Sequence, residues 1–203
     1  NKARRLADTA SDSTQILDLR NVLARTATYQ SNINTATNRL KAAENALSGM
    51  TDMLAEAASV ATLGRNENSA DTRASLAPKA QAIVETFYTL FTTEFEGNYL
   101  FSGMNGTASP VAGTGNSTAF PGLPLPTDWY LGDSTPPSVS TGTGSSLQYG
   151  VPGNEEAFAQ MKAGLEALWY GLQNNSLTDI DAAITTLESA RTGISVLQGR
   201  IGG

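Results

Sequence analysis

Residues 19–61 read LRNVLARTATYQSNINTATNRLKAAENALSGMTDMLAEAASVA, and apolar or small side chains recur along them at alternating spacings of three and four. The series is Leu19, Val22, Thr26, Tyr29, Ile33, Ala36, Leu40, Ala43, Leu47, Met50, Leu54, Ala57 and Ala61. Such a repeat keeps one stripe of a helix facing a partner over many turns. No proline interrupts it, so we expect one helix over residues 3–63, roughly 90 Å long at 1.5 Å per residue. Gly64 is expected to end this helix, because glycine accepts the left-handed conformation.

Three more amphipathic segments follow. The first is expected from about residue 71 to 96, capped by Ser69 or Asp71, with Pro78 in its first turns. Asn154 marks the start of the next segment, and the last one opens near Thr178 and keeps its three-four spacing to the end of the chain. Four such helices, the first much longer than the others, predict an elongated antiparallel helical bundle.

The middle of the chain has a different composition. Eleven of the 19 glycines and seven of the eight prolines lie between Gly97 and Gly153, and no Lys or Arg occurs between Lys79 and Lys162. Short strands joined by turns fit this pattern. We therefore predict a mainly α fold with a small β insertion, in which residues 1–96 and 154–203 form a helical rod domain and residues 97–153 a β-rich outer domain.

The composition removes most catalytic and ligand-binding chemistry. The chain has no cysteine and no histidine, which excludes disulfides, thiolate or imidazole metal sites and Ser-His-Asp catalysis. With a net charge of −6 and no basic cluster, we expect neither nucleic acid nor membrane as a partner. No apolar run of membrane-spanning length and no secretion signal is present. We expect no catalytic, cofactor-binding or metal-binding residue, no cofactor and no enzymatic activity.

The stretches that resemble chemical sites have simpler interpretations. Residues 113–115 and 142–144 both read Gly-Thr-Gly, but neither continues as a phosphate loop, so we expect turns. Asp179 and Asp181 point apart in the first turn of a helix, which favours a role in capping and in complementing the helix dipole. Glu94 and Glu96 are expected to be a solvated rim.

The aromatic side chains between residues 87 and 101 are expected to be core rather than a ligand box, because most of them are spaced by three or four residues. They are Phe87, Tyr88, Phe91, Phe95, Tyr99 and Phe101.

Two segments carry a family resemblance. Gly97-Asn98-Tyr99-Leu100-Phe101-Ser102-Gly103 resembles the sequence at which hook-associated protein 3, the family of hook-filament junction proteins of bacterial flagella, leaves its helices for its outer domain. Residues 177–184 (LTDIDAAI) and the segment LQGRI at 197–201 resemble the C-terminal rod helix shared by flagellins and junction proteins. The order of the predicted elements agrees with the flagellin superfamily along essentially the whole chain.

The resemblance implies a structural subunit that joins hook to filament by self-assembly and mechanical coupling. It implies as partners other copies in a ring, hook-associated protein 1, flagellin, and an export chaperone bound through a missing terminus. It also implies an extracellular location on the bacterial flagellum after export without a cleaved signal. Since the sequence begins at Asn1 and its helical pattern continues to Ile201, we expect a fragment without the inner-tube segments, monomeric by itself.

Other functions stay open from the sequence. Filament flagellin has similar rod helices. A monomeric binding or adhesin module is a second alternative, in which Trp129, Tyr130 and Tyr149 contact a glycan. An enzyme built on a clustered carboxylate pair is a third.

Overall fold

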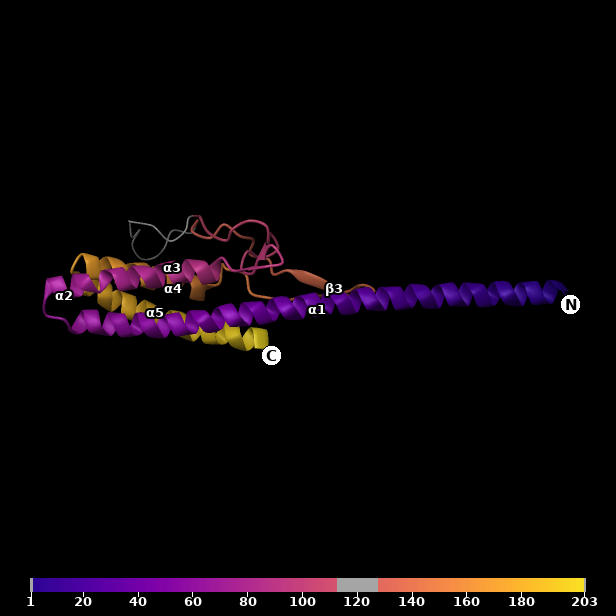
Figure 1. The fold of residues 1–203 in the computed structure, drawn as a ribbon, viewed down its shortest axis with the longest axis horizontal. Coiled ribbons are helices and arrows are strands. Elements are labelled where there is room, and N and C mark those ends of the chain that lie inside the picture. The colour runs from indigo at the N-terminus through magenta and orange to yellow at the C-terminus, as the bar shows by residue number, and fades with distance from the viewer. Residues whose placement is uncertain (1, 113–127, 203) are drawn as a thin grey trace. The chain divides into compact units, whose positions relative to one another are not determined.

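The computed structural model describes residues 2–112 and 128–202, with side chains described from residue 12 onward (Figure 1). Its helices are α1 (Lys2–Asn66), α2 (Ala70–Ser75), α3 (Ala77–Phe91), α4 (Glu156–Gln173) and α5 (Leu177–Gly202). Its strands are β1 (Glu94–Phe95), β2 (Asn98–Tyr99), β3 (Ser138–Gly142) and β4 (Ser145–Gln148). The expected mainly helical fold is confirmed. The predicted turn at residues 113–115 lies outside the described residues.

The chain divides into two compact units. Unit 1 contains Asn1–Asn38 and Ser138–Gln148, and unit 2 contains Arg39–Pro137 and Tyr149–Gly203. Helix α1 contributes to both, because its 65 residues run without a break through the boundary. The long first helix predicted from the three-four repeat is therefore present.

In unit 2, α1 and α3 pack side by side in opposite directions. The Lys79 ammonium lies 3.4 Å from the Glu56 carboxylate, while Gly49 lies against the side chain of Leu90. Residue numbers that increase along one helix therefore decrease along the other, which makes the pair antiparallel. Pro78 lies in the first turn of α3. A backbone N–H at this position would have no acceptor within the helix, so proline costs no helical hydrogen bond there.

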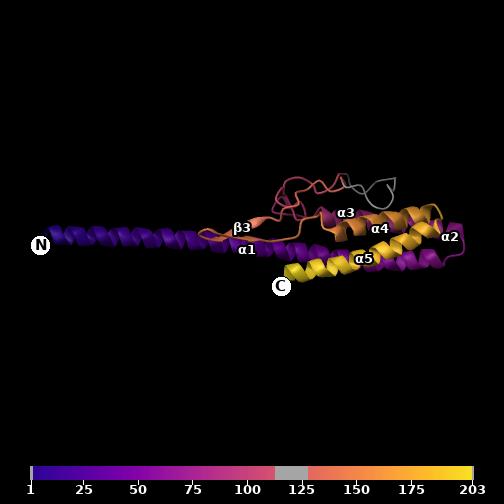
Figure 2. The ribbon, with the colours of Figure 1, turned by 180° about the vertical axis from the view of Figure 1, so that it is seen from behind.

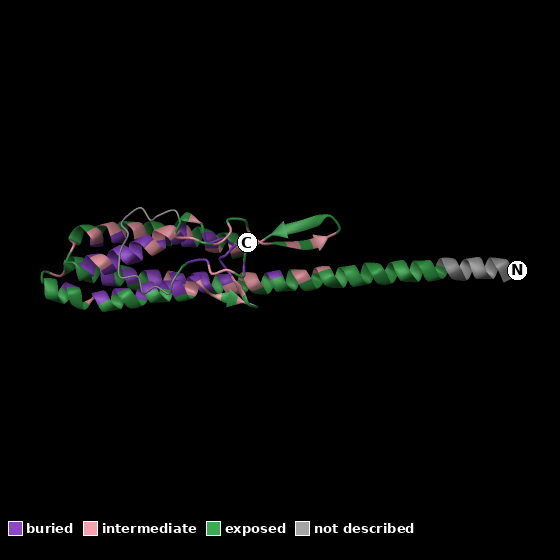
Figure 3. Ribbon diagram, turned by 90° about the horizontal axis from the view of Figure 1, so that it is seen from above, coloured by how far each residue is buried: buried purple, intermediate pink, exposed green. Residues whose placement is uncertain are grey.

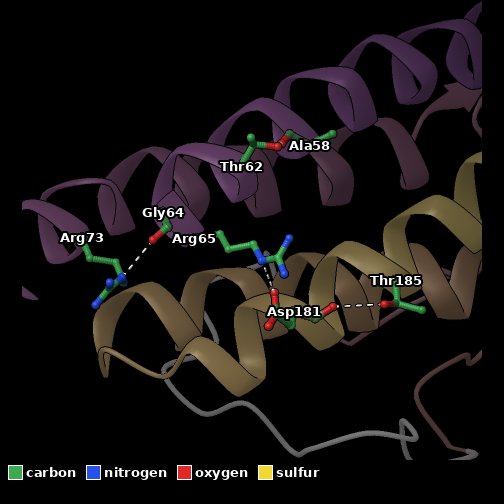
Figure 4. Close-up of polar contacts among 7 residues, drawn as sticks. All are labelled: Ala58, Thr62, Gly64, Arg65, Arg73, Asp181 and Thr185. Atoms are coloured by element: carbon green, nitrogen blue, oxygen red, sulfur yellow. Dashed lines mark hydrogen bonds and ion pairs between the residues drawn. The ribbon is translucent and has the colours of Figure 1, made fainter. Parts of the chain in front are cut away.

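Helix α5 runs antiparallel to α1 in the same unit (Figures 1 and 2). Near the start of α5, Asp181 accepts from the Arg65 guanidinium at 2.7 Å (Figure 4), and near its end the Gln198 amide approaches the Thr51 hydroxyl at 3.4 Å. Both polar contacts lie beside the buried seam rather than in it. Helices α1, α3, α4 and α5 thus form the antiparallel bundle that the sequence predicts.

Glycines allow α4 and α5 to approach closely. A Cβ on Gly164 would lie 2.8 Å from Leu187 Cγ and 3.2 Å from its backbone nitrogen, and a Cβ on Gly193 would lie 2.6 Å from that of Ala157. No real side chain fits at such distances. The small residues of this seam therefore determine how near the two helices lie.

We predict that Gly164→Ala destabilises unit 2 by about 1–2 kcal/mol, since the overpacking penalty exceeds the gain in helix propensity. Gly199→Ala is the matched control, because a Cβ there meets nothing within 4 Å. The control should be neutral or stabilising by up to about 1 kcal/mol. Urea unfolding of both variants measures the difference, and equal midpoints would contradict the close packing.

Aromatic side chains fill the end of the bundle where α3 and α4 meet. The Phe91 ring stacks on that of Phe101, with 5.6 Å between the ring centroids, and its centroid lies 5.1 Å from that of Phe158. All three rings are fully buried. The prediction that the aromatic run is core is confirmed for Phe87, Tyr88, Phe91 and Phe101, whereas Phe95 and Tyr99 are half-buried.

Gly64 does not end α1, and this prediction was wrong. The helix continues to Asn66, and Gly64 keeps a negative φ. A Cβ at this position would lie 2.3 Å from the Leu172 side chain. The absence of a side chain at Gly64 therefore allows α1 to pack closely against α4, and Gly64 does not end the helix.

The second predicted helix is also shorter than expected. It is broken at Leu76 into α2 and α3, and it ends at Phe91 rather than near Glu96. Ser69 caps α2 as predicted, accepting from the Thr72 N–H. Beyond Phe91, β1 and β2 form a hairpin whose two loop residues, Glu96 and Gly97, have φ of 51° and 74°. Positive φ at both positions is typical of the tightest hairpin turns.

The region from residue 97 to 153 contains little strand in its described part. Besides β2, it holds the β3–β4 hairpin and one isolated bridge between Val111 and Tyr130. The rest of the described backbone there forms turns, bends and irregular segments. The β insertion is therefore small, as expected, and its β-rich character is not seen.

Candidate assembly surface

The acidic side chains singled out by the sequence do not gather into a site. Glu94 and Glu96 are exposed, as expected for a rim. Helix α5 is capped by Ser176, whose hydroxyl accepts from the Asp179 N–H at 3.3 Å, so the aspartates are not the cap. Asp181 instead pairs with Arg65. Among the described side chains, those of residues 12–112 and 128–202, no group of acidic residues is arranged to hold a metal ion.

A buried polar cluster between α3 and α4 was not anticipated. Glu166 is 4% exposed, and its Oε1 accepts from the Lys162 ammonium at 2.6 Å and from the Tyr88 hydroxyl at 3.2 Å. Burial and the neighbouring carboxylate raise the pKa of Tyr88 well above its usual value. The only signal in the sequence is the four-residue spacing of Lys162 and Glu166, which normally indicates an exposed helical pair.

A second buried charge, Arg73, joins three segments at the end of the bundle where α1 ends. Its Nε donates to the Gly64 carbonyl at 2.9 Å (Figure 4), and its other nitrogens donate to the Glu67 carbonyl and to the Asn175 side chain. All three acceptors are uncharged oxygens near the end of α1 and the α4–α5 turn. Arg73 is therefore a structural clamp, and its charge complements the negative end of the α1 dipole.

Trp129 and Tyr130, two of the three aromatic residues proposed for glycan contact, are packed inward, and the third, Tyr149, is half-buried. The Trp129 ring lies 5.6 Å from that of Phe91, and the Tyr130 hydroxyl donates toward the Phe101 and Asp133 carbonyls while accepting from the Gly153 N–H. Burial is the main cause that raises the pKa of Tyr130 to about 12. Tyr130 thus holds three loop segments together, and neither ring forms an exposed platform.

The exposed apolar face of unit 1 is the most conspicuous surface of the described residues. It consists of side chains on α1 that are 44–68% exposed. The exposed part of the helix ribbon is green in Figure 3. Five of these side chains share about a third of the helix circumference at about 100° per residue, namely Ile16, Leu19, Val22, Leu23 and Ile33, and Leu17 is exposed on another side of the helix. Leu19, Val22 and Ile33 belong to the stripe of α1 with three-four spacing. The later residues of this stripe, from Ala36 onward, are largely buried.

An apolar face on a single helix is not stabilised by contact with water. Residues 12–35 are exposed or half-exposed throughout, and isolated helices are marginal without a packed apolar face. Contiguous exposed apolar surface marks interaction sites. We therefore identify this stretch of α1 as the candidate assembly surface.

Unit 1 also contains a hairpin with unpaired edges. Strands β3 and β4 pair only with each other among the described strands, with Val139 opposite Leu147, and Asn32 of α1 donates to the Ser140 carbonyl at 3.4 Å. Thr143 and Gly144 form its turn, within the predicted turn at 142–144, and Gly144 has a φ of 72°. Free strand edges can pair with another polypeptide. Both parts of unit 1 thus offer groups suited to association.

The fold and this surface define a helical subunit suited to association with other subunits. The chain belongs to the family of the bacterial flagellin N-terminal helical region, whose model matches residues 2–106. This membership places it among the structural proteins of the bacterial flagellum.

Within that family, the fold is that of FlgL. The chain is similar to Bacillus cereus FlgL, with a TM-score of 0.69 and 18% identity over 94% of this chain and 89% of that one. A putative flagellar hook-associated protein from Vibrio parahaemolyticus matches with a TM-score of 0.71 and 18% identity, over 94% of this chain and 85% of that one. The flagellar junction protein FlgL from Legionella pneumophila matches with a TM-score of 0.61 and 13% identity, over 93% of this chain and 99% of that one.

A search of curated protein sequences found no significant match. No helix among the described residues has the length and apolar character needed to span a membrane.

Proposed function

We propose that this chain is a structural subunit that joins the flagellar hook to the filament. The observation that carries the proposal is the similarity of the fold to FlgL along nearly the whole of both polypeptides. The exposed apolar face of α1 supports it, because a subunit that works by self-assembly needs such surface. The role is mechanical coupling, without a chemical step.

Filament flagellin is the alternative within the family. The segment Gly97–Gly103 and the short, single outer domain favour the junction protein. In this proposal residues 1–96 and 154–203 form the rod and residues 97–153 the outer domain, with its strands confined to short hairpins. An adhesin receives no support, because Trp129 and Tyr130 are packed against the core.

The proposed partners follow from the junction position. They are other copies in a ring, hook-associated protein 1 on one side and flagellin on the other, with an export chaperone before assembly. The proposed location is the outside of the cell, after export without signal cleavage. The 203-residue chain by itself is proposed to be monomeric.

Complementation tests the proposal. The full-length gene should restore motility to a strain that lacks its junction protein, and it should not restore filaments to a strain that lacks flagellin. The opposite pattern would identify a filament flagellin, and failure in both strains after normal export would reject a flagellar junction role.

Variants of the apolar face sharpen the test. Leu19→Asp combined with Leu23→Asp should abolish motility without loss of export, because two charges would be placed in an assembly contact. Asn21→Asp is the matched control, since it adds charge on a different side of the same exposed turn. Full motility of the double variant would contradict the assignment of this surface.

A further inference from the structure

Asn105 and Gly106 form the only Asn-Gly dipeptide of the sequence. They lie in the described loop that follows β2, in which Gly103 has a φ of 64°. Asn105 begins a turn that is closed by a hydrogen bond of 3.3 Å from the Ala108 N–H to the Asn105 carbonyl. The Asn105 side chain is exposed. This pairing of residues has a chemistry of its own, because glycine has no Cβ to shield its backbone nitrogen.

We propose that Asn105 is a site of spontaneous deamidation through its backbone neighbour. The deprotonated Gly106 nitrogen attacks Asn105 Cγ, so that an N–Cγ bond forms and the Cγ–Nδ2 bond breaks, releasing ammonia. The resulting cyclic imide then adds water at one of its two carbonyls. Opening the bond between Cγ and the Gly106 nitrogen gives aspartate, and opening the original peptide bond between Asn105 and Gly106 gives isoaspartate. Water is the only co-reactant, and no oxidant or reductant is needed.

The surroundings of the two reacting atoms favour this step. Among the residues that the structure describes, the Gly106 N–H donates no hydrogen bond, so the attacking nitrogen is not held by a competing bond. The Thr107 hydroxyl lies 3.4 Å from Asn105 Oδ1 and donates to it, which withdraws electron density from Cγ. Gly106 itself is buried against Asn98, which limits the access of hydroxide to its N–H, whereas the Asn105 side chain, which loses ammonia, is exposed to water.

Deamidation at this position has a structural consequence. The Gly106 carbonyl accepts from the Tyr99 N–H at 2.7 Å, and the Tyr99 carbonyl accepts from the Arg39 guanidinium of α1 at 2.8 Å. Isoaspartate adds one carbon to the backbone directly before Gly106, so it displaces the carbonyl that holds β2. Aspartate adds a charge but leaves the backbone unchanged.

Peptide mapping of the aged, folded protein tests the proposal. Asn66 is the internal control: it is exposed, but the N–H that follows it, on Glu67, donates to the Leu63 carbonyl at 3.1 Å. Conversion at Asn105 should exceed that at Asn66 on the order of tenfold, because Asn66 is followed by a residue with a side chain. The rate should rise with pH, since the attacking nitrogen must lose its proton.

The same measurement on the urea-denatured protein separates sequence from structure. Comparable rates in the folded and denatured states support the proposal, and conversion only after denaturation would overturn it, because the fold would then protect the site. Equal, slow rates at Asn105 and Asn66 would overturn it as well. Asn105→Gln should abolish conversion, since the corresponding six-membered ring forms slowly.

Hydrogen exchange at the Tyr99 amide tests the consequence. Exchange should accelerate in the fraction that carries isoaspartate and remain near the starting value in Asn105→Asp, which carries the charge alone. Unchanged exchange in the isoaspartate fraction would contradict the proposed loss of the β2 contact.

Discussion

Leu47→Asp should unfold the helical bundle of unit 2. Leu47 is 0% exposed on the seam of α1, and the substitution removes its packing and places an unpaired charge in the core. Cavity formation and buried charge together should lower the free energy of unfolding by more than about 4 kcal/mol. Because domains are stable by only about 5–15 kcal/mol, little folded population should remain at moderate temperature. Thermal unfolding followed by circular dichroism measures the effect.

Two further variants establish that the effect comes from burial. Leu187→Asp changes a 3% exposed residue on α5 and should be similarly damaging. Leu23→Asp makes the same chemical change on α1 at a residue that is 68% exposed, and should alter stability by no more than about 0.5 kcal/mol. Equal melting temperatures for the Leu47 and Leu23 variants would refute the assignment of the seam.

The features that were predictable from the sequence are those set by local periodicity. The three-four spacing from Leu19 to Ala61 identifies α1 and its buried stripe, because helical geometry alone determines which residues share a face. Ser69 was predictable as a cap because an N-cap side chain bonds within its own turn. The aromatic core followed from spacing as well, at Phe87 and Phe91.

The features that were missed depend on contacts between distant segments. Gly64 has the sequence context of a helix end, but its position is required by Leu172, more than a hundred residues away in the sequence. Arg73 lies in a polar stretch that indicates exposure, and only the fold brings it to the end of α1 and to Asn175.

The candidate assembly surface was only half predictable. The stripe on α1 indicates that a partner is needed, but the spacing is the same at Val22 as at Leu47. The structure is needed to show that α3, α4 and α5 pack against one part of the stripe, while side chains such as Leu19 and Val22 stay exposed. That difference between equal sequence signals is what locates the surface.

Glu166→Leu should also be strongly destabilising, with an expected loss of about 3–5 kcal/mol, because it leaves the Lys162 ammonium buried without its carboxylate. The Lys162 side chain is only 11% exposed, so its ammonium would have neither a carboxylate partner nor full contact with water. Glu188→Leu, on the exposed face of α5, is the matched control and should change stability by no more than about 0.5 kcal/mol. Urea unfolding measures both.

The double variant Lys162→Met with Glu166→Leu decides what the buried pair contributes. Replacing a buried ion pair by apolar side chains of similar volume is often neutral, or stabilising by about 1–4 kcal/mol. Within the described residues, the Glu166 Oε2 atom has no hydrogen-bond partner. The cost of removing this atom from water is therefore not recovered. We therefore expect the double variant to be at least as stable as the natural sequence, even though Glu166→Leu alone is strongly destabilised. Tyr88→Phe should lose about 1 kcal/mol, the value of one hydrogen bond to a charged group partly offset by removing a buried hydroxyl. If the double variant is as unstable as the single one, the ion pair stabilises the α3–α4 contact outright, and burial of these charges is not a net cost to the bundle.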